Sequence, residues 1–135
     1  MIPAVVVTWV AVVLGLDAGA SLGQQRLLGL GTWVLLAVLL RTQDRLTPVQ
    51  VGVVVAFASV IEYVFAGWLG VYVYRLHNVP SFVPPGHGLV YLAAVVIGRS
   101  AWAHRQPGLL PACRRVCGLW ARGGLTRAPP PDFLG

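Results

Sequence analysis

One stretch decides the fold class: VQVGVVVAFASVIEYVFAGWLGVYVY, which runs from Val49 to Tyr74. It has 26 residues and a single charged side chain, Glu62, near its middle. As an α-helix it would be roughly 39 Å long at 1.5 Å per residue, which exceeds the roughly 30 Å hydrocarbon core of a bilayer. We therefore predict a membrane-spanning helix over this stretch.

The composition of the whole chain points in the same direction. Of its 135 residues, 57% are hydrophobic and 10% are charged, and the mean hydropathy is +0.76. An ordinary soluble domain has about 25% charged residues, so this chain lacks the polar side chains needed to cover a compact fold in water. The sequence therefore predicts one all-α domain, a polytopic transmembrane helix bundle, with the lipid bilayer as its main partner.

Further apolar segments accompany this one, within a transmembrane domain of residues 1–104. About four spans are predicted, at 2–20, 27–40, 49–74 and 86–104. The first span could instead be a cleaved signal sequence, because Ala18 and Ala20 form an A-x-A pattern. The start of the chain lacks the positive charges that such a signal has. A retained first helix is therefore the preferred interpretation.

The character of the chain changes over 105–135. This segment is rich in proline, glycine and arginine, which predicts an irregular basic tail. Its part from Leu109 to Trp120 is a candidate for a short amphipathic piece that lies on the membrane. Two cysteines, Cys113 and Cys117, are too few for a disulfide scaffold. Because the chain ends soon after APPPD, a truncated or frame-shifted form of a longer membrane protein is also considered.

All ten basic residues are arginines, and their positions predict the orientation of the chain. The first and third loops contain only Arg26 and Arg75. The remaining arginines lie on the other side: Arg41, Arg45, Arg99, Arg105, Arg114, Arg115, Arg122 and Arg127. Because positive residues collect on the cytoplasmic side, we predict a multi-pass protein of the cell (inner) membrane with both termini in the cytoplasm. The arginines follow no nucleic-acid-binding pattern, so no nucleic-acid partner is expected.

Glu62 is the first candidate functional residue, because a carboxylate inside a membrane is costly unless it is neutral, paired or facing a wet cavity. It could act as a proton relay, a cation site or a general acid, or it could form a structural ion pair. Arg99 is the predicted partner. Both residues lie twelve positions below the outer ends of adjacent antiparallel spans, at Tyr74 and His87, which is roughly 18 Å deep.

The segment RLHNVPSFVPPGHGLVY, from Arg75 to Tyr91, is the second candidate and is predicted to face outward. It holds two histidines, whose imidazoles suit proton transfer near neutral pH and metal binding. The predicted ligand-binding residues are His77, Asn78, His87 and Tyr91. The catalytic candidates are Glu62, His77 and His87. A metal needs three or more converging ligands, and this segment has no Cys, Asp or Glu, so no metal site and no cofactor are expected.

The backbone of this segment supports two interpretations. Pro84 and Pro85 are expected to interrupt a helix, and Gly86 and Gly88 free the backbone on both sides of His87. These features are typical of a histidine that is placed for a function. A simple PPG turn with His87 at the level of the lipid headgroups would carry the same residues.

PPGHG resembles the PSGH element of the lipid-phosphate phosphatase superfamily, but Pro85 replaces the serine and the accompanying motifs are absent. Residues 62–99 more closely resemble an uncharacterised family of multi-pass integral membrane proteins, best known from high-GC Gram-positive bacteria. HNVPSFVPPGHG, residues 77–88, is the most specific part of this resemblance. The resemblance implies a bacterial polytopic membrane protein, of which this chain would be a truncated member, and it supplies no activity.

Three expectations about function follow. The leading one is an integral membrane protein of unassigned activity whose outward His/Pro/Gly loop binds a small ligand or a lipid headgroup. The second is a membrane-embedded enzyme that uses Glu62, His77 and His87. The third is a structural subunit or a fragment of a larger membrane protein. The substrate and the oligomeric state stay open.

Overall fold

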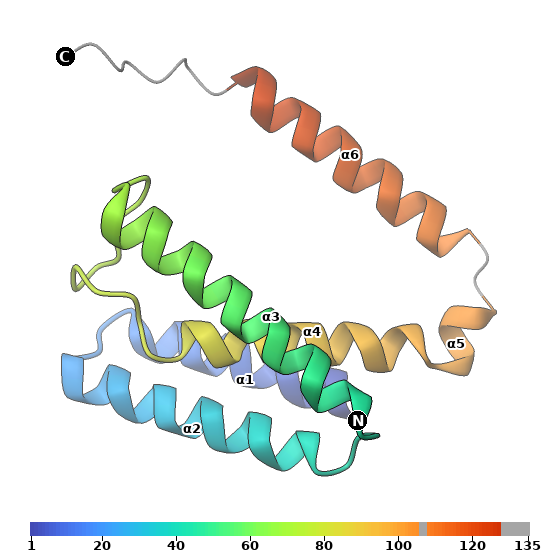
Figure 1. The fold of residues 1–135 in the computed structure, drawn as a ribbon, viewed down its shortest axis with the longest axis horizontal. Coiled ribbons are helices and arrows are strands. Elements are labelled where there is room, and N and C mark those ends of the chain that lie inside the picture. Colours follow the sequence, from blue (N-terminus) through green and yellow to red (C-terminus); the bar gives the residue numbers. More distant parts are fainter. Residues whose placement is uncertain (106–107, 128–135) are drawn as a thin grey trace. The chain divides into compact units, whose positions relative to one another are not determined.

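The computed structural model describes residues 1–105 and 108–127, and the regular secondary structure of these residues is helical (Figure 1). The chain divides into two compact units, Met1–Ile97 and Gly98–Gly135. Each unit is described by itself below. The predicted all-α architecture is confirmed for the described residues.

The first unit begins with a helical hairpin. α1, Ile2–Asp17, is followed by α2, Leu22–Leu40, and Ser21 caps the start of α2. Ser21 Oγ accepts a hydrogen bond from Gln24 N, and Gln24 Oε1 accepts one of 2.8 Å from Ser21 N. This reciprocal cap satisfies two backbone donors that have no partner inside the helix. It explains why α2 begins five residues before the predicted span of 27–40.

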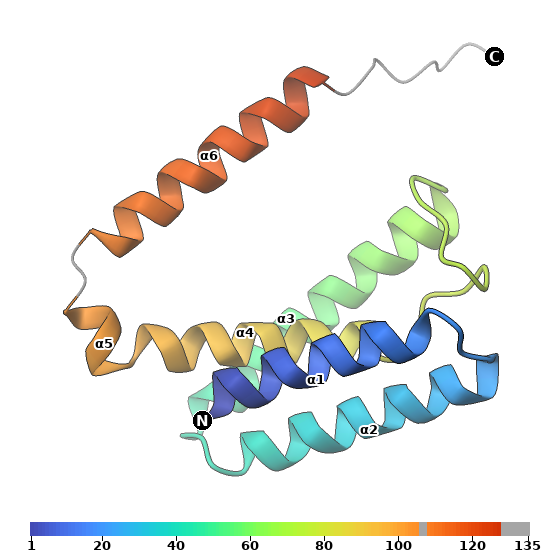
Figure 2. The same ribbon diagram turned by 180° about the vertical axis from the view of Figure 1, so that it is seen from behind.

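The two helices of the hairpin lie side by side (Figure 2). Trp9 Nε1 donates a hydrogen bond of 3.0 Å to Thr32 Oγ1, and Thr32 Oγ1 donates one of 2.7 Å to Leu28 O. The Trp9 ring also lies against Gly31, where an added Cβ would be 3.2 Å from it. The hairpin is therefore joined by a partly buried polar contact as well as by apolar packing.

α3, Leu46–Glu62, continues directly into η1, Tyr63–Trp68, where the helix widens to π-helical hydrogen bonding. The helix ends at Trp68 and does not reach Tyr74 as the sequence predicts. Gly70 has a positive φ of 62°, a conformation that glycine adopts without strain, and the chain reverses there. Glu62 consequently lies near the C-terminal end of this helix, not at its middle.

α4, Val83–Gly98, contains the two prolines that the sequence analysis assigns to a loop. Pro84 and Pro85 lie in its first turn, where a missing backbone N–H breaks no helical hydrogen bond. The hydrogen bond of 2.9 Å from Gly86 N to Phe82 O belongs to this first turn. His87 is therefore a residue of a helix, and the loop before α4 covers only residues 69–82.

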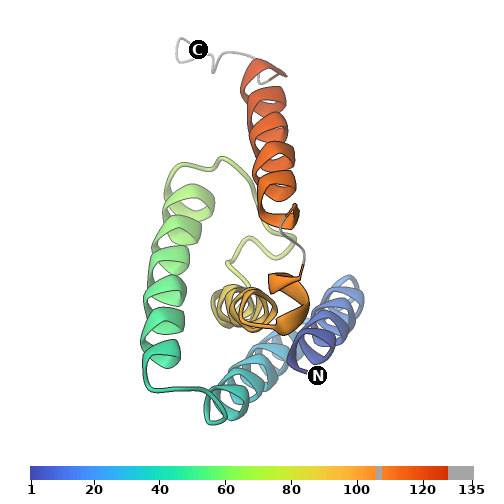
Figure 3. The same cartoon turned by 90° about the vertical axis from the view of Figure 1, so that its right-hand side faces the viewer.

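α4 is the central helix of the first unit, with α3 on one side and the α1–α2 hairpin on the other (Figure 3). The buried core cluster draws on all four helices and consists of Val6, Leu36, Val51, Leu89, Leu92 and Ala93. Gly88 lets α4 approach its neighbours closely, because an added Cβ would lie 2.8 Å from Val55 and 2.9 Å from Leu36. This packing fixes the orientation of α4, and with it the direction in which His87 faces α3.

Within the described ranges, two helices are long and apolar enough to cross a membrane. They are α2, with 19 residues, and the continuous helix Leu46–Trp68, with 23 residues. Only 22% and 6% of their apolar windows are buried inside the molecule. A core helix of a soluble protein buries most of its apolar side chains, so these two helices differ from such a helix. α1 and α4 are apolar but shorter, with 16 residues each.

The described residues of the second unit form two helices, α5, Ala101–His104, and α6, Leu109–Arg127. The sequence predicts an irregular tail over 105–135, whereas 19 of these residues form α6. Pro111 is in the first turn of α6, where proline is tolerated. Residues 106–107 and 128–135 of the predicted tail lie outside the described residues.

Candidate functional site

Residues 69–82, here called the anchored loop, are fastened to the turn between α1 and α2. The Arg75 guanidinium donates hydrogen bonds to the main-chain oxygens of Asp17 at 2.8 Å and of Ala20 at 2.5 Å. Carbonyls at the end of a helix have no helical donor, so Arg75 supplies one. The anchored loop is held at its middle by these two bonds.

Gln25 is the centre of a second set of contacts with the anchored loop. It is buried, and its Nε2 donates to Asp17 Oδ1 at 2.9 Å while its Oε1 accepts from Asn78 Nδ2 at 3.0 Å. Ser81 Oγ donates to Gln25 O at 3.1 Å. Asn78 thus has a structural contact as well as being a predicted ligand-binding residue. Its Oδ1 is buried and has no hydrogen-bond partner in the described part of the chain.

The reversal at Gly70 brings two tyrosines back onto Glu62. The hydroxyls of Tyr72 and Tyr74 both donate to Glu62 Oε2, that of Tyr74 at 2.7 Å. The two rings meet edge to face, with their centroids 5.6 Å apart. Together with His87, these residues form what we call the carboxylate cluster.

His87 approaches the other oxygen of Glu62. Its Nε2 is 3.8 Å from Glu62 Oε1, and its Nδ1 is 2.9 Å from Val83 O. A carbonyl oxygen only accepts hydrogen bonds, so Nδ1 carries the hydrogen and, in the neutral ring, Nε2 carries the lone pair. The His87 side chain is 42% exposed and that of Glu62 is 14% exposed. The cluster can therefore exchange a proton or contact a ligand at Nε2 and Oε1.

Both tyrosines of the cluster are held in the protonated form. The hydrogen bond to Glu62 is the main cause that raises the pKa of Tyr72. Burial is the main cause that raises the pKa of Tyr74, and its hydrogen bond to Glu62 adds to the effect. The two hydroxyls therefore stay hydrogen-bond donors throughout the neutral pH range.

We expect alkaline pH to break the hydrogen bonds of the carboxylate cluster by removing the protons of Tyr72 and Tyr74. The raised pKa means that the folded protein holds these protons more tightly than the unfolded chain does. The contribution to stability is thus complete below the ordinary tyrosine pKa of about 10 and is lost as the pH rises through the folded-state values. Tyrosinate absorbance should keep rising above pH ~10, and Tyr74→Phe should remove the latest component. An unchanged titration curve in Tyr74→Phe would contradict this assignment.

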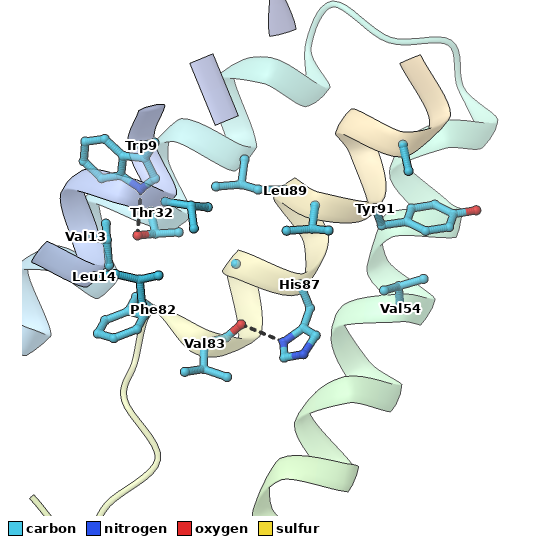
Figure 4. A pocket seen from close by; sticks show the side chains of 14 residues that line it. Trp9, Val13, Leu14, Thr32, Val54, Phe82, Val83, His87, Leu89 and Tyr91 are labelled. Atoms are coloured by element: carbon cyan, nitrogen blue, oxygen red, sulfur yellow. Dashed lines mark hydrogen bonds between the residues drawn. The ribbon is translucent and has the colours of Figure 1, made fainter. Parts of the chain in front are cut away.

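An apolar cavity of about 640 Å³ adjoins the cluster (Figure 4). Its volume is within the range of about 300–1,000 Å³ that is usual for ligand sites. Its walls come from all four helices and the anchored loop, and they include Trp9, Val13, Leu14, Phe82 and Leu89. The cavity is therefore suited to an apolar ligand or to the apolar part of an amphiphile.

A second apolar hollow, of about 430 Å³, lies along α3. It is lined by Val53, Val54, Phe57, Ala58, Ile61, Glu62 and His87. Val54 and His87 line both this hollow and the larger cavity. His87 is thus a polar group placed between two apolar surfaces, on the side of α4 that faces α3 (Figure 4).

The structure brings Glu62 and His87 together, whereas Glu62 has no hydrogen bond with the other predicted ligand-binding residues among those that the structure describes. His77, which has a φ of 54°, lines a different hollow together with Asn78. Tyr91 lines the apolar cavity, and its hydroxyl points away from the His87 ring (Figure 4). Arg99 belongs to the second unit, so its ion pair with Glu62 stays a prediction.

Tyr72 and Tyr74 are the members of the carboxylate cluster that the sequence analysis misses. Counted as part of one long helix over 49–74, they would lie three turns beyond Glu62 and could not reach it. The available signal is Gly70, which precedes the alternating sequence VYVY and marks a point where the chain can reverse.

Among residues 1–105 and 108–127, no three His, Cys, Asp or Glu side chains are grouped so that they could hold a metal ion. The polar chemistry of the site is therefore that of one carboxylate, one imidazole and two phenols. Comparisons with protein families, with curated proteins and with solved structures find no match for this chain.

Proposed function

We propose that this protein is an integral membrane protein that binds a membrane lipid at the carboxylate cluster. The acyl part of the lipid would occupy the apolar cavity, and the headgroup would reach His87 and Glu62. One observation carries this proposal. His87 lines the cavity of about 640 Å³, and its Nε2 lies 3.8 Å from Glu62 Oε1.

The free positions of the cluster favour a headgroup with hydrogen-bond donors. Tyr72 and Tyr74 occupy Glu62 Oε2. The remaining Oε1 and the Nε2 of neutral His87 are both acceptors. An ammonium group could donate to both and a hydroxyl group to one of them, whereas a phosphate oxygen would meet the carboxylate charge. We therefore propose an amine-bearing or hydroxyl-bearing headgroup.

The proposal includes a four-span arrangement in the cell (inner) membrane of a bacterium. The two long helices support it, and α1 and α4 add two apolar helices of roughly 24 Å. A bilayer thins locally around spans that are shorter than its core. The arginine distribution favours cytoplasmic termini and places the anchored loop outside.

Filling the apolar cavity should displace the lipid. Gly86 lines the cavity, and an added Cβ there would meet no atom within 4 Å. The variant Gly86→Leu should therefore fold normally and place its side chain where the acyl part of the lipid would lie. We expect roughly tenfold less lipid to be retained, which corresponds to about 1.4 kcal/mol. Native mass spectrometry of the protein purified in mild detergent measures the retained lipid.

Gly52→Leu is the matched control. Gly52 is also a helical glycine with open space around it, and it lines neither of the two apolar hollows. This variant should retain lipid as the wild type does. Equal retention by Gly86→Leu and the wild type, with both proteins folded, would overturn the proposed site.

A membrane-embedded acid–base enzyme is the second candidate function. It is favoured by the bond between His87 Nδ1 and Val83 O, which fixes the tautomer that leaves Nε2 able to accept a proton. Glu62 and His87 would carry the proton transfer, and His77 would take no part. Under this alternative, the mass spectra of the wild type would show a chemically changed lipid. The spectra of the His87→Gln variant would show the unchanged lipid only.

A further inference from the structure

We propose that α6 lies flat in the interface of an anionic membrane, with its apolar face in the lipid and its arginines at the headgroups. The inference concerns the second unit alone and does not rest on the lipid site of the first unit. It assigns a binding surface to a segment that the carboxylate cluster leaves without a role.

Over residues 111–122, the side chains of α6 divide between two faces. At 3.6 residues per turn, one arc of about 160° in this range contains only small or apolar residues: Ala112, Cys113, Val116, Cys117 and Leu119. The opposite arc, of about 100°, contains the arginines at 114, 115 and 122 together with Pro111 and Gly118. An apolar face bordered by arginines is the pattern of helices that lie in a membrane interface.

The apolar face of α6 is open. Val116 is 65% exposed and Leu119 is 70% exposed, and both cysteines are exposed. Most helical stability in proteins comes from packing an amphipathic face and not from the helix propensity of the residues. A partner that covers this face would therefore stabilise α6.

The charge of α6 and its place in the chain favour a lipid surface as this partner. Arg114 and Arg115 lie on opposite borders of the apolar arc, where long side chains can bury their stems and reach the headgroups. The described part of α6 has no acidic residue to oppose an anionic surface. Only ten residues, 99–108, separate the end of α4 from the start of α6, and the first unit carries the apolar helices long enough to cross a membrane.

The two native cysteines provide the test, because they are the only cysteines of the chain. The full chain with Cys117→Ser carries a fluorophore at Cys113, on the apolar face. In the matched variant, both native cysteines are replaced by serine and Gly118→Cys provides the labelling site. The fluorophore is then at position 118. Gly118 is on the opposite face, and an added Cβ there meets no atom within 4 Å. Both proteins are placed in phosphatidylcholine vesicles with and without phosphatidylglycerol.

In anionic vesicles, nitroxide groups on lipid acyl chains should quench the fluorophore at Cys113, and aqueous iodide should quench the one at position 118. Each arginine strengthens binding to an anionic surface roughly fivefold. Replacing Arg114 and Arg115 by glutamine should therefore weaken the binding of α6 by roughly tenfold or more, which is measured as a loss of lipid quenching at Cys113. Replacing both by lysine should preserve the binding. Equal quenching at the two positions would overturn the proposal. Protection of Cys113 from both quenchers would also overturn it, because protein would then cover this face.

Discussion

Gly29→Ala should destabilise the protein strongly. A Cβ at this position would lie 2.0 Å from Ser81 Oγ and 2.9 Å from the main-chain carbon of Ser81. It would therefore push the anchored loop off α2. Overpacking costs about 1–3 kcal/mol, and contact with main-chain atoms places this change at the upper end. We expect the free energy of unfolding to fall by about 3 kcal/mol and the melting temperature to fall by about 10 °C.

Tryptophan fluorescence in detergent follows this melting, and two further variants control it. Gly23→Ala lies in the same helix, with its nearest neighbour 4.0 Å away. It should melt at the wild-type temperature or slightly above, because alanine favours a helix over glycine. Ser81→Gly in the Gly29→Ala background removes the closest atoms and should restore part of the loss. If Gly29→Ala and Gly23→Ala melt alike, the anchored loop is not seated on α2.

Glu62→Ala is the second change with a large expected effect. It removes the acceptor of the Tyr74 hydroxyl, which lies 2.7 Å away. A hydrogen bond to a charged group contributes about 1.5–3 kcal/mol. Since Glu62 is 14% exposed, we expect a loss of about 2 kcal/mol in the free energy of unfolding. Glu62→Gln keeps an oxygen acceptor and should lose less.

Double-mutant cycles on thermal unfolding decide between two partners for Glu62. Glu62→Ala combined with Tyr74→Phe should give a coupling of about 1–2 kcal/mol. Glu62→Ala combined with Arg99→Leu measures the ion pair predicted from the sequence. A coupling near zero with Tyr74 would contradict the carboxylate cluster. A coupling with Arg99 as large as that with Tyr74 would support the ion pair.

Hydropathy alone predicts the helical architecture, because long apolar runs leave the backbone few ways to satisfy its hydrogen bonds outside water. The helix ends are less well predicted. The apolar run that contains Glu62 continues past Gly70 with no change in hydropathy, although the helix ends at Trp68. The end is set by one backbone conformation at Gly70, and hydropathy carries no information about it.

The same limit applies to the candidate site. The sequence singles out Glu62 because a carboxylate inside a membrane is costly, and His87 because imidazole suits proton transfer. The structure places Glu62 Oε1 3.8 Å from His87 Nε2. Their tyrosine partners depend on the direction of the chain after the reversal, which no local pattern specifies. The sequence predicts Pro84 and Pro85 in a loop, because proline interrupts a helix. The same residues are tolerated where a helix begins, and α4 begins at Val83.

The tail illustrates a related difficulty. Its prolines and glycines predict irregular structure over 105–135, whereas α6 covers Leu109–Arg127. Pro111 falls in the first turn of this helix, and Gly118 is compensated by neighbours such as leucine, alanine and arginine that favour helices. Composition does not take account of where proline and glycine lie along the chain. It therefore underestimates the tendency to form a helix when these residues lie at positions where a helix tolerates them.

The attachment of Arg75 to the α1–α2 turn bears on how the polypeptide could be processed after synthesis. A protease that cut after Ala20 would remove both main-chain oxygens that hold the Arg75 guanidinium. It would also remove the Asp17 carboxylate that orients Gln25, and the Trp9 and Val13 wall of the cavity. Cleavage at this point would therefore remove the contacts that fasten the anchored loop to the α1–α2 turn, together with one wall of the cavity.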